Sequence, residues 1–255
     1  MTSFWKHVLI FGAALLAGGV NSIAGGGSLI TFPTLIFLGV SPVRANVTNT
    51  VGLWPGSFGG VIGFRRDMPD PNLTALLAIP SLIGGIVGAF LLLHTPVHLF
   101  EVMAPFLVLG ATLLLAVQEQ LSRRLARTLP IAGSGPWIVV AVGFQLLVAM
   151  YGGFFGAGIG ILMLAALALL GMKDIHQMNG LKNVLAIAIN GVAAIYFIAA
   201  GAVVWVDALL MAVASVIGGL TGAALAHRLG RTFVRRAVVA IGLLATASLL
   251  VRYLF

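Results

Sequence analysis

The sequence lacks cysteine and has few charged residues, and each shortage excludes a class of protein. Without cysteine in 255 residues, the chain can form neither a disulfide nor a thiolate metal site. Charged residues make up 8% of the chain and hydrophobic residues 60%, whereas a soluble domain carries about 25% charged residues. These residues could not cover a globule with polar surface, so we expect an all-α integral membrane protein.

Acidic residues are the scarcest of the charged ones. Only six are present, Asp67, Asp70, Glu101, Glu119, Asp174 and Asp207, and all lie in loops or near the ends of apolar segments. No carboxylate is therefore available as a proton relay at mid-membrane.

The net charge of +8 comes from basic residues in short loops. This pattern is typical of membrane topology and does not indicate a nucleic-acid partner.

Apolar segments of about 20 residues, the length that crosses a bilayer, occur at 46–64, 73–93, 98–117, 183–200, 205–225 and 237–255. Two longer segments, 8–38 and 137–171, are interrupted in the middle by glycines. The start of the chain superficially resembles a signal peptide, but its apolar pattern continues, so we interpret it as part of the mature fold.

The two halves of the sequence resemble each other. "SLIGGIVGA" at 81–89 matches "SVIGGLTGA" at 215–223, and "AGGG" at 24–27 matches "AGIG" at 157–160, at nearly constant offsets. We interpret residues 1–118 and 136–255 as two repeats joined by a cytoplasmic linker loop, 119–135. The glycines of the longer motif are attributed to helix packing, because glycine permits close approach.

Basic residues indicate how the segments cross. If every long segment crosses once, Lys and Arg divide evenly between the two faces, against the positive-inside rule. If segments 8–38 and 137–171 each enter and return, eleven lie on one face and only Lys6, Arg44 and Arg252 on the other. Each half is then a broken or re-entrant hairpin, with arms of about 11–15 residues, plus three spanning helices. The second half is inverted, and both termini are periplasmic.

The breaks predict an anion site. Irregular backbone at membrane depth must be buried in protein or line a cavity, and a helix that starts there offers free N–H groups and partial positive charge. We predict tips near 21–28 and 152–160, with short helices starting near Ser28 and Ile159. Polar residues that follow each hairpin extend the site. The predicted substrate-binding residues are Asn21, Ser22, Gly25, Gly26, Gly27, Ser28, Thr31, Asn46, Asn49, Thr50, Gly156, Ala157, Gly158, Gly160, Asn179, Lys182, Asn183 and Asn190.

Two details of this site stay open at this stage. Lys182 either neutralises an anion or extends to the lipid headgroups. Trp54, Pro55 and Gly56 interrupt their helix either as a gate, formed by Trp54 and Pro55, or as a packing break.

Residues 18–67 and 174–205 resemble the sulfite exporter TauE/SafE family of membrane permeases. The resemblance extends from Val8 to Tyr253 and includes the triplet Gly25–Gly27, the Asn-rich helix start at 46–50 and "NGLKN" at 179–183. It implies export or uptake of small sulfur-containing anions such as sulfite or organosulfonates across a bacterial inner membrane, and we expect export. The expected partners are that anion and the lipid bilayer. No cofactor and no metal are expected, and a homodimer is compatible with the sequence.

Other functions were weighed against transport. A serine enzyme needs a base near Ser28, but all five histidines lie in loops or at segment ends. Metal transport has neither cysteine nor buried carboxylates to support it. A gated anion channel and a non-transporting assembly factor remain as alternatives that the sequence does not exclude.

Overall fold

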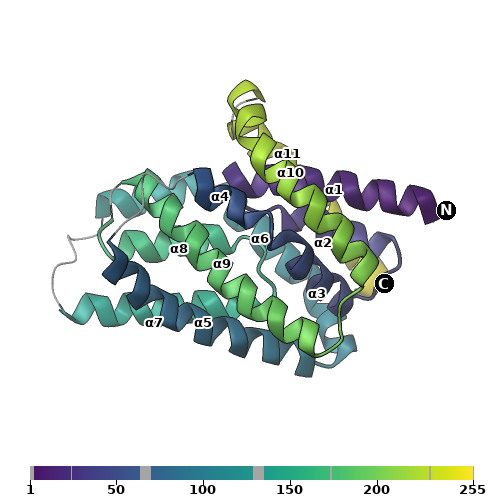
Figure 1. The fold of residues 1–255 in the computed structure, drawn as a ribbon, viewed down its shortest axis with the longest axis horizontal. Helices are drawn as coiled ribbons and strands as arrows, with labels where there is room; N and C mark the ends of the chain where they lie inside the picture. The colour runs from purple at the N-terminus through teal and green to yellow at the C-terminus, as the bar shows by residue number, and fades with distance from the viewer. Residues whose placement is uncertain are drawn as a thin grey trace.

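The computed structural model describes residues 3–23, 25–63, 70–128, 135–172, 174–229 and 231–254, and the regular elements there are all helices. This confirms the predicted all-α class. The first half comprises α1 (Ser3–Ile23), α2 (Ser28–Phe37), α3 (Pro42–Leu53), α4 (Ser57–Gly63), α5 (Pro71–His94) and α6 (Val97–Thr128). The second comprises α7 (Gly135–Phe154), α8 (Ile159–Leu169), α9 (Ile175–Ala199), α10 (Trp205–Leu229) and α11 (Arg231–Leu254) (Figure 1).

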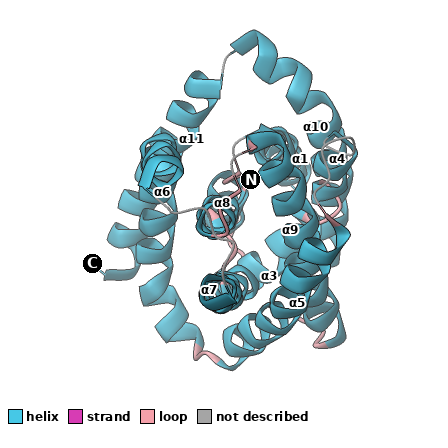
Figure 2. Cartoon of the chain, turned by 90° about the vertical axis from the view of Figure 1, so that its left-hand side faces the viewer, coloured by secondary structure: helices cyan, strands magenta, loops and turns pink. Residues whose placement is uncertain are grey.

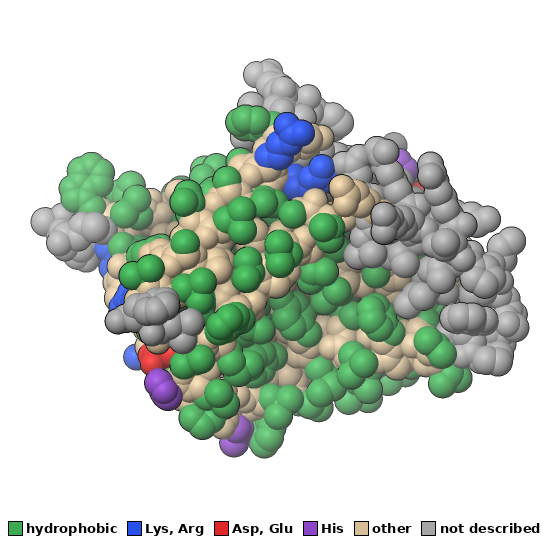
Figure 3. All heavy atoms as spheres, turned by 180° about the vertical axis from the view of Figure 1, so that it is seen from behind, with side chains coloured by type: hydrophobic (Ala, Val, Ile, Leu, Met, Phe, Trp, Pro, Cys, Tyr) green, Lys and Arg blue, Asp and Glu red, His purple; other side chains and the backbone are tan. Residues whose placement is uncertain are grey.

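The surface of the molecule suits a lipid environment. Five helical stretches are long and apolar enough to cross a membrane: Phe4–Asn21, Pro71–His94, Val97–Gln118, His176–Ala199 and Thr232–Tyr253. Apolar side chains cover much of the face in Figure 3, while the coloured charged side chains lie toward its margins. An apolar surface of this extent is what a multi-pass membrane protein presents to hydrocarbon.

Both long apolar segments break where the sequence predicts. The chain leaves helix between Ile23 and Ser28 and again between Phe154 and Ile159. The arms, however, are unequal, so the expectation of 11–15 residues per arm is wrong. The first arms have 21 and 20 residues and the second arms 10 and 11. At 1.5 Å per residue, a first arm is about 30 Å long and a second arm about 15 Å.

Packing explains why α1 continues through its first pair of glycines. A Cβ atom on Gly18 would lie 2.3 Å from the carbonyl oxygen of Ser215 in α10. Across the same contact, a Cβ on Gly218 would lie 2.0 Å from the carbonyl oxygen of Leu15. These glycines let two helix backbones touch, so they stay helical and the break occurs further along.

Each first arm packs against a helix of the other half. α1 lies along α10, and α7 lies along α5 (Figure 1). In the second pair, a Cβ on Gly88 would lie 2.0 Å from the Met150 carbonyl oxygen. The packing interpretation of both glycine motifs is thereby confirmed. The exchange of partners is what a two-fold relation between the halves would produce, while their opposite orientation in a membrane stays a prediction.

Two boundaries differ from the expected segments. Segment 46–64 is two helices, α3 and α4, separated by a turn at 54–56. Helix α6 continues to Thr128, well into the segment expected as a linker loop. The division into two repeats, residues 1–118 and 136–255, stays a prediction.

One end of the molecule holds both termini (Figure 1). There the ammonium group of Lys6 lies 3.2 Å from the carboxylate of Asp207, and the guanidinium of Arg252 donates to the carbonyl of Ile36 at 3.1 Å. Arg65, Arg66 and Lys173, which the topology prediction assigns to the opposite face, lie outside the described residues.

Candidate functional site

The two hairpin tips meet at a cavity of about 80 Å³. This exceeds the roughly 10–15 Å³ that one water needs, so it has room for several waters or a small anion. Helix α8 lies in the interior of the helix bundle (Figure 2). The cavity is lined by Asn21, Gly25, Gly26, Ser28, Asn49, Thr50, Leu53, Trp54, Gly56, Ser57, Phe155, Gly156, Gly158, Ile159, Gly160, Met163, Lys182, Asn183, Ala186 and Asn190.

Glycine shapes both tips in the same way. Gly25 and Gly26 have φ values of 75° and 94°, and Gly156 and Gly158 have 77° and 74°. Positive φ is the left-handed region that glycine adopts without steric cost. Both tips therefore use left-handed glycines, which are consecutive in the first tip and separated by Ala157 in the second.

The first tip is held by Asn21. Its side-chain oxygen Oδ1 accepts a hydrogen bond from the Gly27 N–H at 2.8 Å, across the turn that leads into α2. Gly27 has no room for a side chain, because a Cβ would lie 2.4 Å from the Ala17 carbonyl oxygen. The start of α2 is thus fixed close to the end of α1, beside the cavity.

The second tip is held by Tyr151. Its hydroxyl donates to the Ala157 carbonyl at 2.7 Å. Its own carbonyl accepts the N–H groups of Phe155 and Gly156, at 2.8 and 3.1 Å. One residue near the end of α7 therefore anchors the three residues that precede Gly158.

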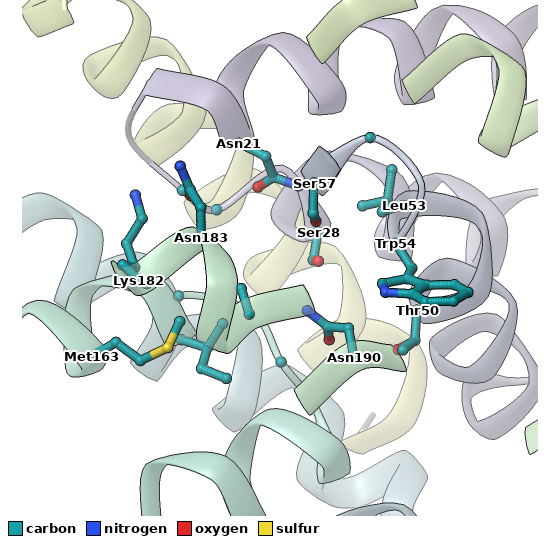
Figure 4. A pocket seen from close by; sticks show the side chains of 18 of the residues that line it. Asn21, Ser28, Thr50, Leu53, Trp54, Ser57, Met163, Lys182, Asn183 and Asn190 are labelled. Carbon is teal, nitrogen blue, oxygen red and sulfur yellow. The ribbon is translucent and has the colours of Figure 1, made fainter. Parts of the chain in front are cut away.

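Helix α9 supplies a lysine and two asparagines to the cavity lining. Lys182 is only 5% exposed, and its ammonium group donates to Asn179 Oδ1 at 3.1 Å. Asn183 is 7% exposed, and its Nδ2 donor has no hydrogen-bond partner. Asn190 lies further along α9, with its Oδ1 near the tip at Gly156. Figure 4 shows these side chains extending from α9 near Asn21 and Ser28.

The charge of the lining is one-sided. Lys182 is a lining cation, and no Asp or Glu is among the described residues that line the cavity. Opposite charges attract each other more strongly in a partly buried site than in bulk water. The lining therefore favours an anionic occupant over a cationic one.

Trp54 forms part of the cavity wall and is fixed to the opposite half. Its indole N–H donates to the Ile187 carbonyl at 3.1 Å, and its ring covers Gly191, where a Cβ would lie 3.1 Å from the ring. Pro55 is half-buried in the turn and does not line the cavity. A gating role for these two residues stays a prediction.

Most predicted site residues come together, but several do not. Outside the lining lie Gly27, Thr31, Asn46, Ala157 and Asn179, and the side chain of Ser22 lies outside the described ones. Their polar groups are used within the protein instead. The Thr31 hydroxyl donates to Asn49 Oδ1, and Asn46 Nδ2 donates to the Phe154 carbonyl at 2.8 Å. These residues support the lining residues and do not form the cavity wall.

Some residues that line or support the cavity are not predicted from the sequence. Ser57 and Met163 line the cavity, and Tyr151 orders the second tip. Ser57 could have been found from the repeat, because it stands 133 residues before Asn190, the offset of the aligned tips. For Met163 the sequence contains no comparable signal, since it is one of many apolar residues in α8.

Comparison with known proteins identifies one family and several relatives. Residues 10–249 match the family model described as sulfite exporter TauE/SafE. The chain is 28% identical over 243 residues to the probable membrane transporter protein YfcA of Escherichia coli K12, covering 95% of this chain and 88% of that protein. It is 28% identical over 249 residues to a probable membrane transporter protein of Haemophilus influenzae, covering 94% and 93%.

A third relative is the probable membrane transporter protein ORF9 of a Sinorhizobium species, 25% identical over 251 residues, covering 97% of this chain and 94% of that protein. No solved structure gives a significant match. The family match covers nearly the whole chain, both tips and α9 included, which confirms the resemblance noted in the sequence. The chain belongs to the sulfite exporter TauE/SafE family of membrane transporters.

Proposed function

We propose that this protein exports small sulfur-containing anions, such as sulfite or organosulfonates, across a bacterial inner membrane. The anion binds in the cavity between the two hairpin tips. The observation that carries the proposal is the side chain of Lys182, a residue only 5% exposed, in a lining without a carboxylate among the described residues.

Three kinds of donor support an anion at this position. Lys182 contributes a full positive charge. Helices α2 and α8, of 10 and 11 residues, begin at the cavity, and each N-terminus carries about half an elementary charge. Asn183 Nδ2 is a buried donor without a partner among the described residues, which an anion oxygen would satisfy.

The direction of transport follows from the membrane potential. An anion that leaves a negative-inside cell gains about 2.3 kcal/mol per charge for each 100 mV. Export therefore needs no coupling ion. With both termini on the periplasmic side, the basic loops face the cytoplasm and the second half is inverted relative to the first.

The test is anion flux into proteoliposomes that contain the purified protein. Sulfite, thiosulfate, sulfate, sulfoacetate and taurine are compared for wild type, Lys182→Met and Arg44→Met. Both substitutions remove one positive charge, but Arg44 is exposed and lies outside the cavity lining. We expect saturable flux of a sulfur anion in wild type and in Arg44→Met, and at least a tenfold loss in Lys182→Met.

Thermal unfolding of each variant is measured beside the flux. Methionine has a volume close to that of lysine and carries no charge whose burial must be compensated, so Lys182→Met should stay folded. Wild-type flux and KM in this variant would contradict the proposed site. Flux that neither saturates nor shows counterflow would identify a gated channel instead of a carrier.

A further inference from the structure

Tyr151 contacts the second tip through both its backbone and its side chain. Its backbone carbonyl receives two N–H groups, and its hydroxyl reaches six residues along the chain to the Ala157 carbonyl at 2.7 Å. It lies outside the cavity lining, whereas Gly158, the residue after Ala157, is part of the lining.

The peptide between Ala157 and Gly158 connects these two observations. In a planar trans peptide the C=O and N–H groups point in opposite directions, and no cis peptide occurs among the described residues. The hydroxyl of Tyr151 therefore determines the direction of two groups at once. It holds the Ala157 carbonyl toward itself and thereby turns the Gly158 N–H the opposite way.

We propose that Tyr151 is a positioning residue that keeps the Gly158 N–H directed at the anion and the Ala157 carbonyl directed away from it. This inference rests on the proposed anion site. Without the hydroxyl, the peptide can rotate, because Gly158, at a φ of 74°, has no Cβ to restrict it. Rotation would turn a carbonyl oxygen toward the anion, which repels it.

The first tip provides a comparison within the same molecule. There Asn21 Oδ1 accepts the Gly27 N–H, also across six residues. The side chain of Asn21 thus binds a backbone N–H group, whereas the side chain of Tyr151 binds a backbone carbonyl. The contact of Asn21 removes a backbone donor from the first tip. The contact of Tyr151 leaves the N–H group of the same peptide available to an anion.

The experiment compares wild type with Tyr151→Phe, which removes only the hydroxyl and retains the ring. Tyr196→Phe is the matched control, since Tyr196 is half-buried among Phe90 and Phe197 and outside the lining. Sulfite binding at equilibrium, the KM and maximal rate of sulfite flux, and thermal unfolding are measured. A further variant carries para-aminophenylalanine at position 151 and restores a donor there.

In Tyr151→Phe we expect Kd and KM to rise roughly tenfold, since a lost hydrogen bond to a charged group costs about 1.5–3 kcal/mol. The maximal rate should stay within about twofold, and the para-amino variant should recover most of the affinity. Wild-type Kd and KM in a folded Tyr151→Phe protein would overturn the inference, and so would a failure of the para-amino variant to recover.

If wild type neither binds nor transports sulfite while another sulfur anion is transported, the same measurements are made with that anion. Absence of flux in wild type with every anion would overturn the proposed function itself, and this role of Tyr151 with it.

Discussion

The tip between α1 and α2 and the tip between α7 and α8 border one cavity, and each places two glycines at positive φ. Their supporting side chains differ. Asn21 holds the first tip through a backbone N–H, and Tyr151 holds the second through a backbone carbonyl. A glycine turn can thus be stabilised through an N–H group or through a carbonyl, and the supporting side chain determines which backbone donors remain.

The helices that follow the hairpins differ more strongly. At the offset of 133 that aligns the tips, Asn49 corresponds to Lys182 and Thr50 to Asn183. Asn49 Oδ1 accepts the Thr31 hydroxyl, and the Thr50 hydroxyl donates to the Asn46 carbonyl at 3.0 Å. Two polar groups of the first half are therefore engaged within the protein. The second half provides the lysine and the unpartnered Asn183 donor, so we expect it to contribute most of the binding energy.

The largest expected effect concerns the membrane topology of the first half and is all-or-none. Because the native chain has no cysteine, single substitutions Ser41→Cys and Asn72→Cys report accessibility directly, and both positions are exposed. In intact cells a membrane-impermeant maleimide should label position 41 from the periplasm. It should label position 72 only after the membrane is permeabilised. Labelling of both from one side would contradict the inverted-repeat topology.

A second comparison uses the aligned glycines Gly27 and Gly160. In Gly27→Ala the new Cβ would lie 2.4 Å from the Ala17 carbonyl oxygen, which is backbone and cannot yield. In Gly160→Ala it would lie 3.3 Å from Cδ of Lys182, a flexible side chain. Overpacking costs about 1–3 kcal/mol or more.

We expect Gly27→Ala to lose most transport and at least about 3 kcal/mol of stability, the upper end of that range. Gly160→Ala should stay folded and lose no more than about 1 kcal/mol, the lower end. Unfolding temperature and flux are measured together for the two variants. Equal stability would show that the first tip can relax around a side chain.

The smallest expected effect concerns the aligned pair Asn183 and Thr50. Asn183→Leu removes an unpartnered donor, so binding should weaken about 10–100-fold, as expected for a bond to a charged group. Stability should not fall, because the amide has no partner to lose at that donor. Thr50→Val removes a hydroxyl that already bonds to its own helix and should raise the Kd by no more than about threefold. Titration with the transported anion gives the Kd of both variants. If Thr50→Val weakens binding more than Asn183→Leu does, the first half and not the second contributes most of the binding energy.

Much of this architecture could be predicted from the sequence, because the relevant signals are local. Chain composition and segment length indicate a helical membrane protein, and glycine clusters indicate where helices must break. The starts of α2 and α8 were predicted at the correct residues for the same reason. The arm lengths were predicted wrongly, because the sequence does not show that Gly18 packs against the backbone of Ser215 in the other half, where a side chain would not fit.

The membership of the site depended on contacts between distant segments. Asn46 and Asn49 lie on the same short helix and have the same chemistry, so no sequence rule separates them. Tertiary structure directs Asn46 to the Phe154 carbonyl and leaves Asn49 on the cavity wall. The role of Lys182 was also open in the sequence, since a lysine near a helix start can reach lipid headgroups or remain inside.

The sequence by itself determined the elements: apolar helices of spanning length, two glycine breaks at corresponding positions and the scarcity of acidic groups. These follow from composition and from the conformational freedom of glycine, which depend on residues close together in the chain. Only the tertiary structure decided that Lys182 is buried in the cavity wall and that Tyr151 orients the second tip. The physical reason is that the burial of a side chain depends on which segments the fold brings around it, and the cavity wall combines residues of α1, α3, α8 and α9. The hydrogen bond of Tyr151 reaches only six residues along the chain, but it depends on the turn that the glycines allow.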